Sequence, residues 1–318
     1  MRRREFVGGL LGIGAIGLTG WRELGAESPG GVAMGAAGSA GVPGSGASLG
    51  PLTGPGVEAA GARLPERWGV QLYTVRDAMA ERVSSTLAAV SEMGYGEVEF
   101  AGLFGRSAPE MRAILDGVGL RAASGHVGMD IIRGNWDVAL DEAAILGQDL
   151  IVLPSLPRDA RTADGLRSLA EELNHAGEMA RARGLHLGFH NHGFEVRPLE
   201  SDAGGDGSDS SRPLDILLAH TDPELVSFQL DLFWTVDGGA DPRAYFREHP
   251  GRFLSVHVKD RSTDGRMVDV GAGVMDFAAL LAAGEEAGVR HAFVEHDRPE
   301  NSLESIRNSI RYLNTLRG

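Results

Sequence analysis

The sequence predicts a single α/β domain folded as a (β/α)8 TIM barrel, preceded by a signal peptide and a disordered linker. Strand-like and helix-like segments alternate eight times between residues 65 and 318, and this alternation is typical of parallel strands. Eight such units in roughly 250 residues match the size of a closed barrel. An open doubly wound sheet is the structural alternative. It would usually carry a Gly-rich phosphate turn after the first strand, and "QLYTVRD" has none.

Each unit pairs a short apolar run with a longer amphipathic one. Gly94, Gly119, Gly184 and Gly288 each follow an amphipathic run, as residues that cap the C-terminus of a helix do. The expected strands are 68–75, 97–104, 121–129, 150–157, 185–192, 225–234, 252–260 and 291–297. The expected helices are 78–94, 108–119, 135–147, 165–184, 213–220, 241–250, 276–288 and 302–316.

The chain before the barrel divides into two segments. Residues 1–25 contain "RREFV", which fits the twin-arginine pattern of bacterial export signals, before an apolar run that is too short to span a membrane. Residues 26–64 consist mainly of Gly, Ala, Ser and Pro and predict a flexible linker. Residues 201–213 predict a disordered excursion within the barrel. We therefore expect an exported protein, periplasmic or membrane-anchored facing the periplasm, whose partner is the twin-arginine export machinery.

Composition narrows the chemistry. The chain has no cysteine, which excludes disulfides and thiolate sites. Its net charge of −14 argues against a nucleic-acid partner, which would need a clustered basic face. Lys259 is the only lysine, although Lys and Arg together number 30. A lysine in an arginine-rich chain points to a position where a compact ammonium is needed.

Polar side chains gather where the predicted strands end. The C-terminal ends of barrel strands carry the active site, and period-two alternation places His257 and Lys259 on one face of their strand and Gln229 and Asp231 on one face of another. Several buried carboxylates and imidazoles at one end are costly unless they are compensated. A divalent cation, Mn²⁺, Mg²⁺, Co²⁺ or Zn²⁺, would compensate them. The alternative is a hydrogen-bonded polar layer that caps the barrel.

At these residues the chain resembles the xylose-isomerase-like TIM-barrel superfamily of sugar isomerases and epimerases, and more narrowly its exported branch with the HNHxFE motif. The resemblance rests on "GVQLYTVRD", "MGYGEVEFAG", "HNHGFEV", "LDLFW", "HVKD", "DVGAGVMDF" and "VEHDRP". It implies that Asp231, His257 and Glu295 bind one metal ion. For the fifth strand it implies a carboxylate; the nearest is Glu195, and His190 is the alternative ligand.

The resemblance implies a metal-dependent isomerase or epimerase that moves a proton through an ene-diolate on a non-phosphorylated sugar. The expected catalytic residues are Glu195, Glu295, His190, His192 and Lys259. The expected substrate-binding residues are Gln71, Glu99, His126 and Trp234, with Phe194 beside Trp234 as an apolar wall.

Three other functions remain open. Relatives of the exported type resemble enzymes that cleave 3-keto-glycosides by β-elimination, which would use the same base and metal. A sugar-binding protein without catalysis would need no metal. An endonuclease would need further His and Asp ligands and a basic groove, and this chain is acidic.

Overall fold

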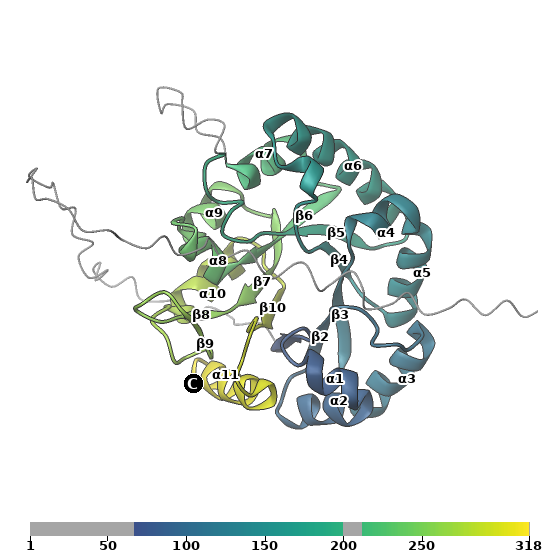
Figure 1. Cartoon of the computed structure of the whole chain (residues 1–318), viewed down its shortest axis with the longest axis vertical. Helices are drawn as coiled ribbons and strands as arrows, with labels where there is room; N and C mark the ends of the chain where they lie inside the picture. Colours follow the sequence, from purple (N-terminus) through teal and green to yellow (C-terminus); the bar gives the residue numbers. More distant parts are fainter. Residues whose placement is uncertain (1–66, 200–211, 318) are drawn as a thin grey trace, which may run out of the picture. The chain divides into compact units, whose positions relative to one another are not determined.

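The computed structural model describes residues 67–199 and 212–317. In this part of the chain eight parallel strands close into a barrel in the order β1-β10-β7-β6-β5-β4-β3-β2, with the helices around it (Figure 1). The barrel closes where Gly69 and Val70 of the first strand pair with Phe293 and Val294 of the last. This confirms the predicted (β/α)8 TIM barrel.

The barrel strands are short and follow the predicted segments closely. They are β1 (Gly69–Gln71), β2 (Glu97–Phe100), β3 (Arg121–His126), β4 (Leu150–Leu153), β5 (His186–His190), β6 (Val226–Asp231), β7 (Phe253–Val258) and β10 (His291–Val294). A small antiparallel pair, β8 (Asp260–Arg261) and β9 (Met267–Val268), lies in the connection after β7.

Helices separate consecutive barrel strands. They are α1 (Arg76–Glu81), α2 (Val83–Glu92), α3 (Ala108–Val118), α4 (Met129–Gly134), α5 (Trp136–Leu146), α6 (Ala163–Arg181), α7 (Pro213–His220), α8 (Leu232–Asp237), α9 (Pro242–Glu248), α10 (Phe277–Glu286) and α11 (Ser302–Thr315), with a 3-10 turn η2 (Arg158–Ala160). None of the helices in the described ranges combines the length and the apolar character needed to cross a bilayer.

Burial on both faces explains why the strands read as apolar runs. All four residues of β4 are buried, as are all six of β7. On β7 the side chains of Ser255 and His257 contact residues of other strands inside the barrel, and Val256 and Val258 belong to the hydrophobic core. The same alternation that builds the core therefore aims selected polar groups inward.

Local signals fix the helix ends. The four predicted capping glycines, Gly94, Gly119, Gly184 and Gly288, all have positive φ, a conformation that glycine adopts without strain. At the start of α3, Ser107 and Glu110 form a reciprocal capping box, which satisfies backbone N–H groups that the helix cannot.

The structure corrects several predicted boundaries. The strand expected at 225–234 ends at Asp231, because the Asp231 side chain accepts the backbone N–H of Trp234 at 2.8 Å and starts α8 there. The helix expected at 78–94 is two helices, because Arg82, with φ −151° and ψ 81°, leaves the helical conformation. The strand expected at 121–129 ends at His126. Residues 212 and 213, predicted to be disordered, begin α7.

The signal peptide expected at 1–25, the linker expected at 26–64 and most of the excursion expected at 201–213 lie outside the described residues.

Candidate metal centre

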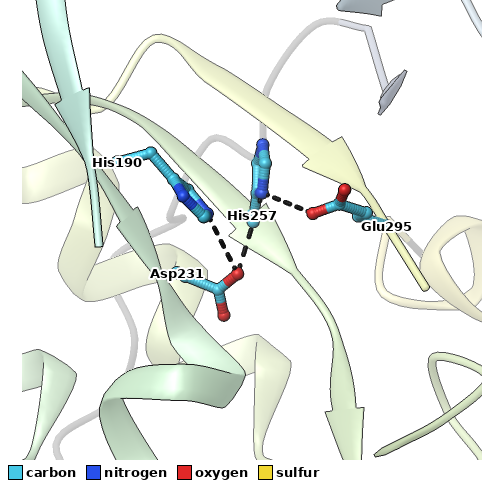
Figure 2. Close-up of side chains that lie close together, drawn as sticks. All are labelled: His190, Asp231, His257 and Glu295. Carbon is cyan, nitrogen blue, oxygen red and sulfur yellow. Dashed lines mark hydrogen bonds and ion pairs between the residues drawn. The ribbon is translucent and has the colours of Figure 1, made fainter. Parts of the chain in front are cut away.

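Four side chains from four neighbouring strands meet at the C-terminal end of the barrel. His190 ends β5, Asp231 ends β6, His257 lies on β7, and Glu295 directly follows β10. Figure 2 shows the four side chains pointing toward one another. All four are buried, and one ligand atom of each lies within 4.8 Å of those of the others. The barrel register produces this meeting, because Asp231 is paired with His257, and His257 with Phe293, two residues before Glu295.

The contacts within this cluster are short. Oδ2 of Asp231 lies 3.3 Å from Nε2 of His190 and 3.7 Å from Nδ1 of His257. Oε2 of Glu295 lies 2.7 Å from the same Nδ1 of His257. We call His190, Asp231, His257 and Glu295 the metal-centre residues.

Each of the two histidines has one ring nitrogen committed away from the cluster. Nδ1 of His190 lies 3.1 Å from the carbonyl oxygen of Pro154 and must donate to it. Nε2 of His257 lies 2.6 Å from Oε1 of Glu99 and donates to that carboxylate. The nitrogens that face the cluster, Nε2 of His190 and Nδ1 of His257, therefore carry lone pairs when the rings are neutral.

Two lone pairs and two carboxylates that face one another repel unless a cation lies among them. Nδ1 of His257 is buried and has no hydrogen-bond partner of acceptable geometry among the described residues, although Glu295 is 2.7 Å away. Such a nitrogen is suited to a metal bond. Two imidazoles with two carboxylates form a donor set that suits Zn²⁺, Mn²⁺ or Co²⁺.

Lys259 supplies the remaining charge at the centre. Its buried Nζ lies 3.0 Å from Oδ2 of Asp231, 2.7 Å from Oε2 of Glu295 and 2.8 Å from Oδ1 of Asp297. Three carboxylates around one ammonium leave two negative charges. Although burial lowers the pKa of His257, Glu295 and Glu99 raise it well above its usual value, so a divalent ion would take the place of a proton on this ring. Burial alone also lowers the pKa of Lys259, but the three carboxylates around it raise it well above its usual value. For Asp231 the two effects have the opposite signs. Burial raises the pKa of Asp231, but Lys259 and His190 bring it well below its usual value.

A second layer of polar residues supports the centre from inside the barrel. Glu99 accepts hydrogen bonds from Nε2 of Gln71 at 2.8 Å, Nε2 of Gln229 at 2.7 Å and Nε2 of His257. Oε1 of Gln229 lies 2.9 Å from Nε2 of His126. Glu99, His126 and His257 could also surround an ion. However, the Glu99 carboxylate already accepts three hydrogen bonds, so it does not require an ion to balance its charge. A hydrogen-bonded polar layer, which was the alternative to a metal site, thus lies next to the metal-centre residues, and the structure contains both arrangements of side chains.

Three residues that the sequence predicted to bind substrate, Gln71, Glu99 and His126, lie in this layer. Gln71 and Glu99 are fully buried and bonded to each other. His126 lies beside Gln229, and its ring stacks on that of His257 at 5.5 Å. The contacts of Gln71, Glu99 and His126 orient His257, in the way that carboxylates behind metal-bound histidines do. How deeply the side chains of these three residues lie inside the barrel could not be inferred from their positions along the strands alone.

The residues of the segment "HNHGFE" make different contacts. His190 belongs to the metal-centre residues. Asn191, which the sequence analysis did not single out, accepts the backbone N–H of Asp231 at 3.0 Å and donates to Oγ1 of Thr235 at 3.2 Å. Asn191 therefore ties the end of β5 to the end of β6. Its position between His190 and His192 is the feature of the sequence that could have indicated a role for Asn191 in the site.

Glu195, the carboxylate expected to bind the metal from the fifth strand, lies apart from the cluster. It belongs to neither group of side chains that could hold an ion, and His190 takes the fifth-strand position instead. The turn after His190 folds the Glu195 side chain back, so that Oε2 accepts the backbone N–H of His192 at 2.9 Å. Burial raises the pKa of Glu195 to about 8, although backbone donors oppose the shift. A neutral acid at pH 7 is a poor metal ligand.

His192 and Trp234 lie at the edge of the cluster. The His192 ring meets that of His190 edge to face at 4.8 Å and lies 5.9 Å from Trp234. Phe194 is 39% exposed, and its ring is nearly parallel to that of His192 at 6.1 Å. The apolar wall predicted from Phe194 and Trp234 therefore includes His192 as its middle member.

Asp260 organises the loop after β7. Its buried carboxylate accepts the backbone N–H groups of Arg261 at 2.7 Å, Gly271 at 2.8 Å, Gly273 at 2.9 Å and Met275 at 3.2 Å. A side chain on Gly273 would collide with this carboxylate. The Asp260 carboxylate of "HVKD" thus holds the backbone of "DVGAGVMDF" in place beside Lys259.

Comparison with known proteins agrees with this architecture. Inosose dehydratase 2 of Bacillus cereus is 31% identical over 99 residues, which cover 31% of this chain and 30% of that protein. The inosose dehydratase of Geobacillus kaustophilus is 25% identical over 197 residues, which cover 55% of this chain and 60% of that protein. The chain thus matches between about a third and three fifths of the length of these curated relatives.

Solved structures extend the similarity to the whole barrel. A sugar phosphate isomerase/epimerase from Parabacteroides distasonis has a TM-score of 0.69 at 25% identity, over 81% of this chain and 95% of that one. The IolI protein, solved with a bound zinc atom, has a TM-score of 0.62 at 15% identity, over 79% of this chain and 97% of that one, and shares the fold alone. The model of the xylose isomerase-like TIM barrel family matches residues 87–316, and the chain belongs to that family.

Proposed function

We propose that this protein is a divalent-metal-dependent enzyme that moves a proton on the carbon beside a carbonyl group of a sugar or a sugar-like polyol, as a sugar isomerase or epimerase does. The observation that carries the proposal is the convergence of His190, Asp231, His257 and Glu295 around a buried nitrogen without a partner among the described residues. We propose these four as the ligands, with His190 in the place first given to Glu195.

A divalent ion in this centre would polarise the carbonyl oxygen of a substrate and so acidify the neighbouring C–H bond. The rest of the chemistry belongs to side chains. Nζ of Lys259 is held among Asp231, Glu295 and Asp297, where it can donate a hydrogen bond to a substrate oxygen as negative charge develops there.

Proton transfer at carbon needs a group with a free lone pair. His190 is unsuited, because one of its nitrogens is bonded to Pro154 and the other faces Asp231. His192 is better suited, because burial and the neighbouring His190 hold its pKa well below the usual value, so it can accept a proton at neutral pH. Glu295 is the second candidate base, since Lys259 and His257 hold its pKa low against the effect of burial. The two follow different strands, β5 and β10, at the two ends of the row of ligand-bearing strands, and an epimerase would need them on opposite faces of the substrate carbon.

Elimination is the second candidate reaction, and the names of the relatives favour it. Two of the matching proteins are inosose dehydratases. The first step would be the same removal of a proton beside a carbonyl. The leaving group, water or the alcohol of a 3-keto-glycoside, would then depart from the next carbon with a proton donated by Lys259 or His192.

One experiment separates the two reactions. The purified, metal-loaded protein is incubated in D2O with free ketoses, an inosose and a 3-keto-glucoside, and the products are followed by NMR. Isomerase or epimerase activity exchanges deuterium into a product with the same number of oxygens. Elimination yields an enone and a released alcohol or water. No turnover and no deuterium exchange with any of these substrates would contradict the proposed function.

We also propose that the protein is exported through the twin-arginine pathway, on the strength of Arg3 and Arg4 in residues 1–25. Replacing both arginines by lysine is expected to leave the protein in the cytoplasmic fraction of a bacterial host. Unchanged periplasmic recovery of that variant would exclude the pathway.

A further inference from the structure

Two ring nitrogens beside the metal centre are buried and have no hydrogen-bond partner among the described residues. They are Nδ1 of His192 and Nε1 of Trp234. The centres of the two rings lie 5.9 Å apart, and the rings are inclined by 52°. A buried polar atom without a partner is unfavourable, and a hydrogen bond from a bound ligand would offset that cost.

Both residues contact metal-centre residues, His192 through its ring and Trp234 through its backbone. The His192 ring meets the ring of His190 at 4.8 Å, and the backbone N–H of Trp234 donates to Oδ1 of Asp231 at 2.8 Å. A molecule whose carbonyl end lies at the metal centre would therefore extend along these rings. Phe194 continues the same wall to the surface, where its side chain is 39% exposed.

We propose that His192 and Trp234 form a hydroxyl-binding subsite, and that the substrate lies against it as a neutral polyhydroxylated ring without a phosphate at this end. Nε1 of tryptophan can only donate, whereas the nitrogen of a neutral imidazole donates or accepts according to its tautomer. Hydroxyl groups both donate and accept, so neighbouring hydroxyls satisfy the two nitrogens in either tautomer. The aromatic faces suit the C–H face of a sugar ring.

The charges around the wall argue for a neutral ligand. Lys259, 6.0 Å from the Trp234 ring centre, is already bound by three carboxylates. The guanidinium of Arg161 lies over the Phe194 ring at 5.1 Å. Arg161 therefore stands over Phe194, the third member of the wall, whereas a phosphate between His192 and Trp234 would face two uncharged rings and a lysine that three carboxylates already bind. The inference rests on the proposed function, because it assumes a sugar-like substrate at the metal centre.

Calorimetric titration of the full-length, metal-loaded protein tests the subsite. The probes are myo-inositol, D-glucose and D-glucose 6-phosphate, which lack the reactive ketone of an inosose or a ketose. We expect both neutral polyols to bind and the phosphate ester to bind more weakly. Trp234→Phe and His192→Phe each keep an aromatic ring and remove a ring nitrogen, and each should weaken binding of the neutral polyols roughly three- to tenfold.

Trp136→Phe is the matched control. Nε1 of Trp136 donates to the carbonyl oxygen of Ala176 at 3.0 Å between two outer helices, so this variant loses an indole N–H elsewhere and should bind like the wild type. Unchanged affinity in Trp234→Phe would show that only water satisfies the wall, and would overturn the inference. Tighter binding of glucose 6-phosphate, or no binding of either neutral polyol at millimolar concentration, would overturn it as well.

Metal content measured on the same samples keeps the two proposals apart. If the wild type holds no ion, the proposed function fails, whatever the titrations show. If the ion is present and Trp234→Phe binds normally, only the hydroxyl subsite fails. Thermal unfolding of each variant verifies that it is folded at the titration temperature.

Discussion

Glu99 is a residue that governs the metal centre without belonging to it. Its carboxylate has three donors and one of them, His257, presents its other ring nitrogen to the cluster. The bond fixes both the tautomer and the tilt of the imidazole, and a negative partner makes the ring a stronger ligand.

Glu99→Gln tests this role. The substitution replaces one acceptor oxygen by an NH2 group that faces donors, and we expect the affinity for the divalent ion to fall about 10- to 100-fold. Competition with a chromophoric chelator measures that affinity. Glu97→Gln on the same strand is the control, because Glu97 bonds Arg121 and His291 at the opposite end. Equal affinity in the two variants would exclude a role for Glu99.

Glu195 gives the fold a dependence on pH. Burial raises the pKa of Glu195 to about 8, above the value of about 4.3 for a free glutamate. The folded state therefore holds a proton that the unfolded state releases, and the free energy of unfolding falls as pH rises from about 4.3 to about 8.

Glu195→Gln carries no titrating group and should remove this decline. Urea unfolding at pH values between 5 and 9 is the measurement, and the difference between the wild-type and variant curves is the readout. We expect a difference on the order of a few kcal/mol that develops below pH 8. Parallel curves would mean that Glu195 is ionised throughout that range.

At the scale of elements, the loops after β5 and β7 are each held by one carboxylate. Asp260 accepts four backbone N–H groups of its loop, and hydrogen bonds to a charged acceptor are roughly twice as strong as neutral ones. The loop lies next to Lys259 in the chain, so its order influences where that ammonium stands.

Asp260→Asn keeps the size of the side chain and loses the charge and one acceptor oxygen. We expect a loss of stability of about 2–4 kcal/mol and faster amide exchange at Gly271 and Gly273. Hydrogen exchange followed by mass spectrometry would locate the change. Asp276→Asn is the control, because Asp276 is exposed and caps α10 through Ala279 alone. If exchange rises equally in both variants, Asp260 is not the anchor of the loop.

Element positions could be predicted largely from the sequence, and their ends could not always be. Eight apolar runs located the eight strands because a strand buried on both faces has little freedom in composition. The helix α8 was not predicted, because "LFW" after Asp231 continues the apolar run of the strand. Only the capping bond, in which the backbone N–H of Trp234 donates to Asp231, shows that a helix begins there. Side-chain direction after a strand end is equally hidden: whether His190 or Glu195 faces the cluster depends on the turn between them.

At the scale of the whole molecule, barrel closure makes the centre. The four metal-centre residues come from β5, β6 and β7 and from the end of β10, which are consecutive in the barrel. Polar residues at the strand ends were expected to gather at one mouth because parallel strands end there, and the family resemblance implied that Asp231, His257 and Glu295 among them bind one ion. The depth of Glu99 and Gln71 was not predicted, because it depends on how far each side chain reaches into the closed interior.

Removing the ion should lower the stability of the whole barrel. An ion that binds only the folded state adds about 2.7 kcal/mol when its concentration is 100 times its dissociation constant. Dialysis against a chelator should therefore lower Tm, and adding the divalent ion back should restore it. We expect the barrel to stay folded without the ion, because Lys259 would still bridge Asp231 and Glu295. A Tm that is indifferent to the chelator would contradict a structural link between the ion and these four strands.

Metal content per chain, measured by elemental analysis of the purified protein and three variants, tests the central claim most directly. We predict one divalent ion per chain in the wild type and in Glu195→Gln, and substantial loss of it in His190→Ala and Asp231→Ala. Full metal content in His190→Ala, together with loss of the ion in Glu195→Gln, would contradict the assignment of the ligands and the chemistry derived from it.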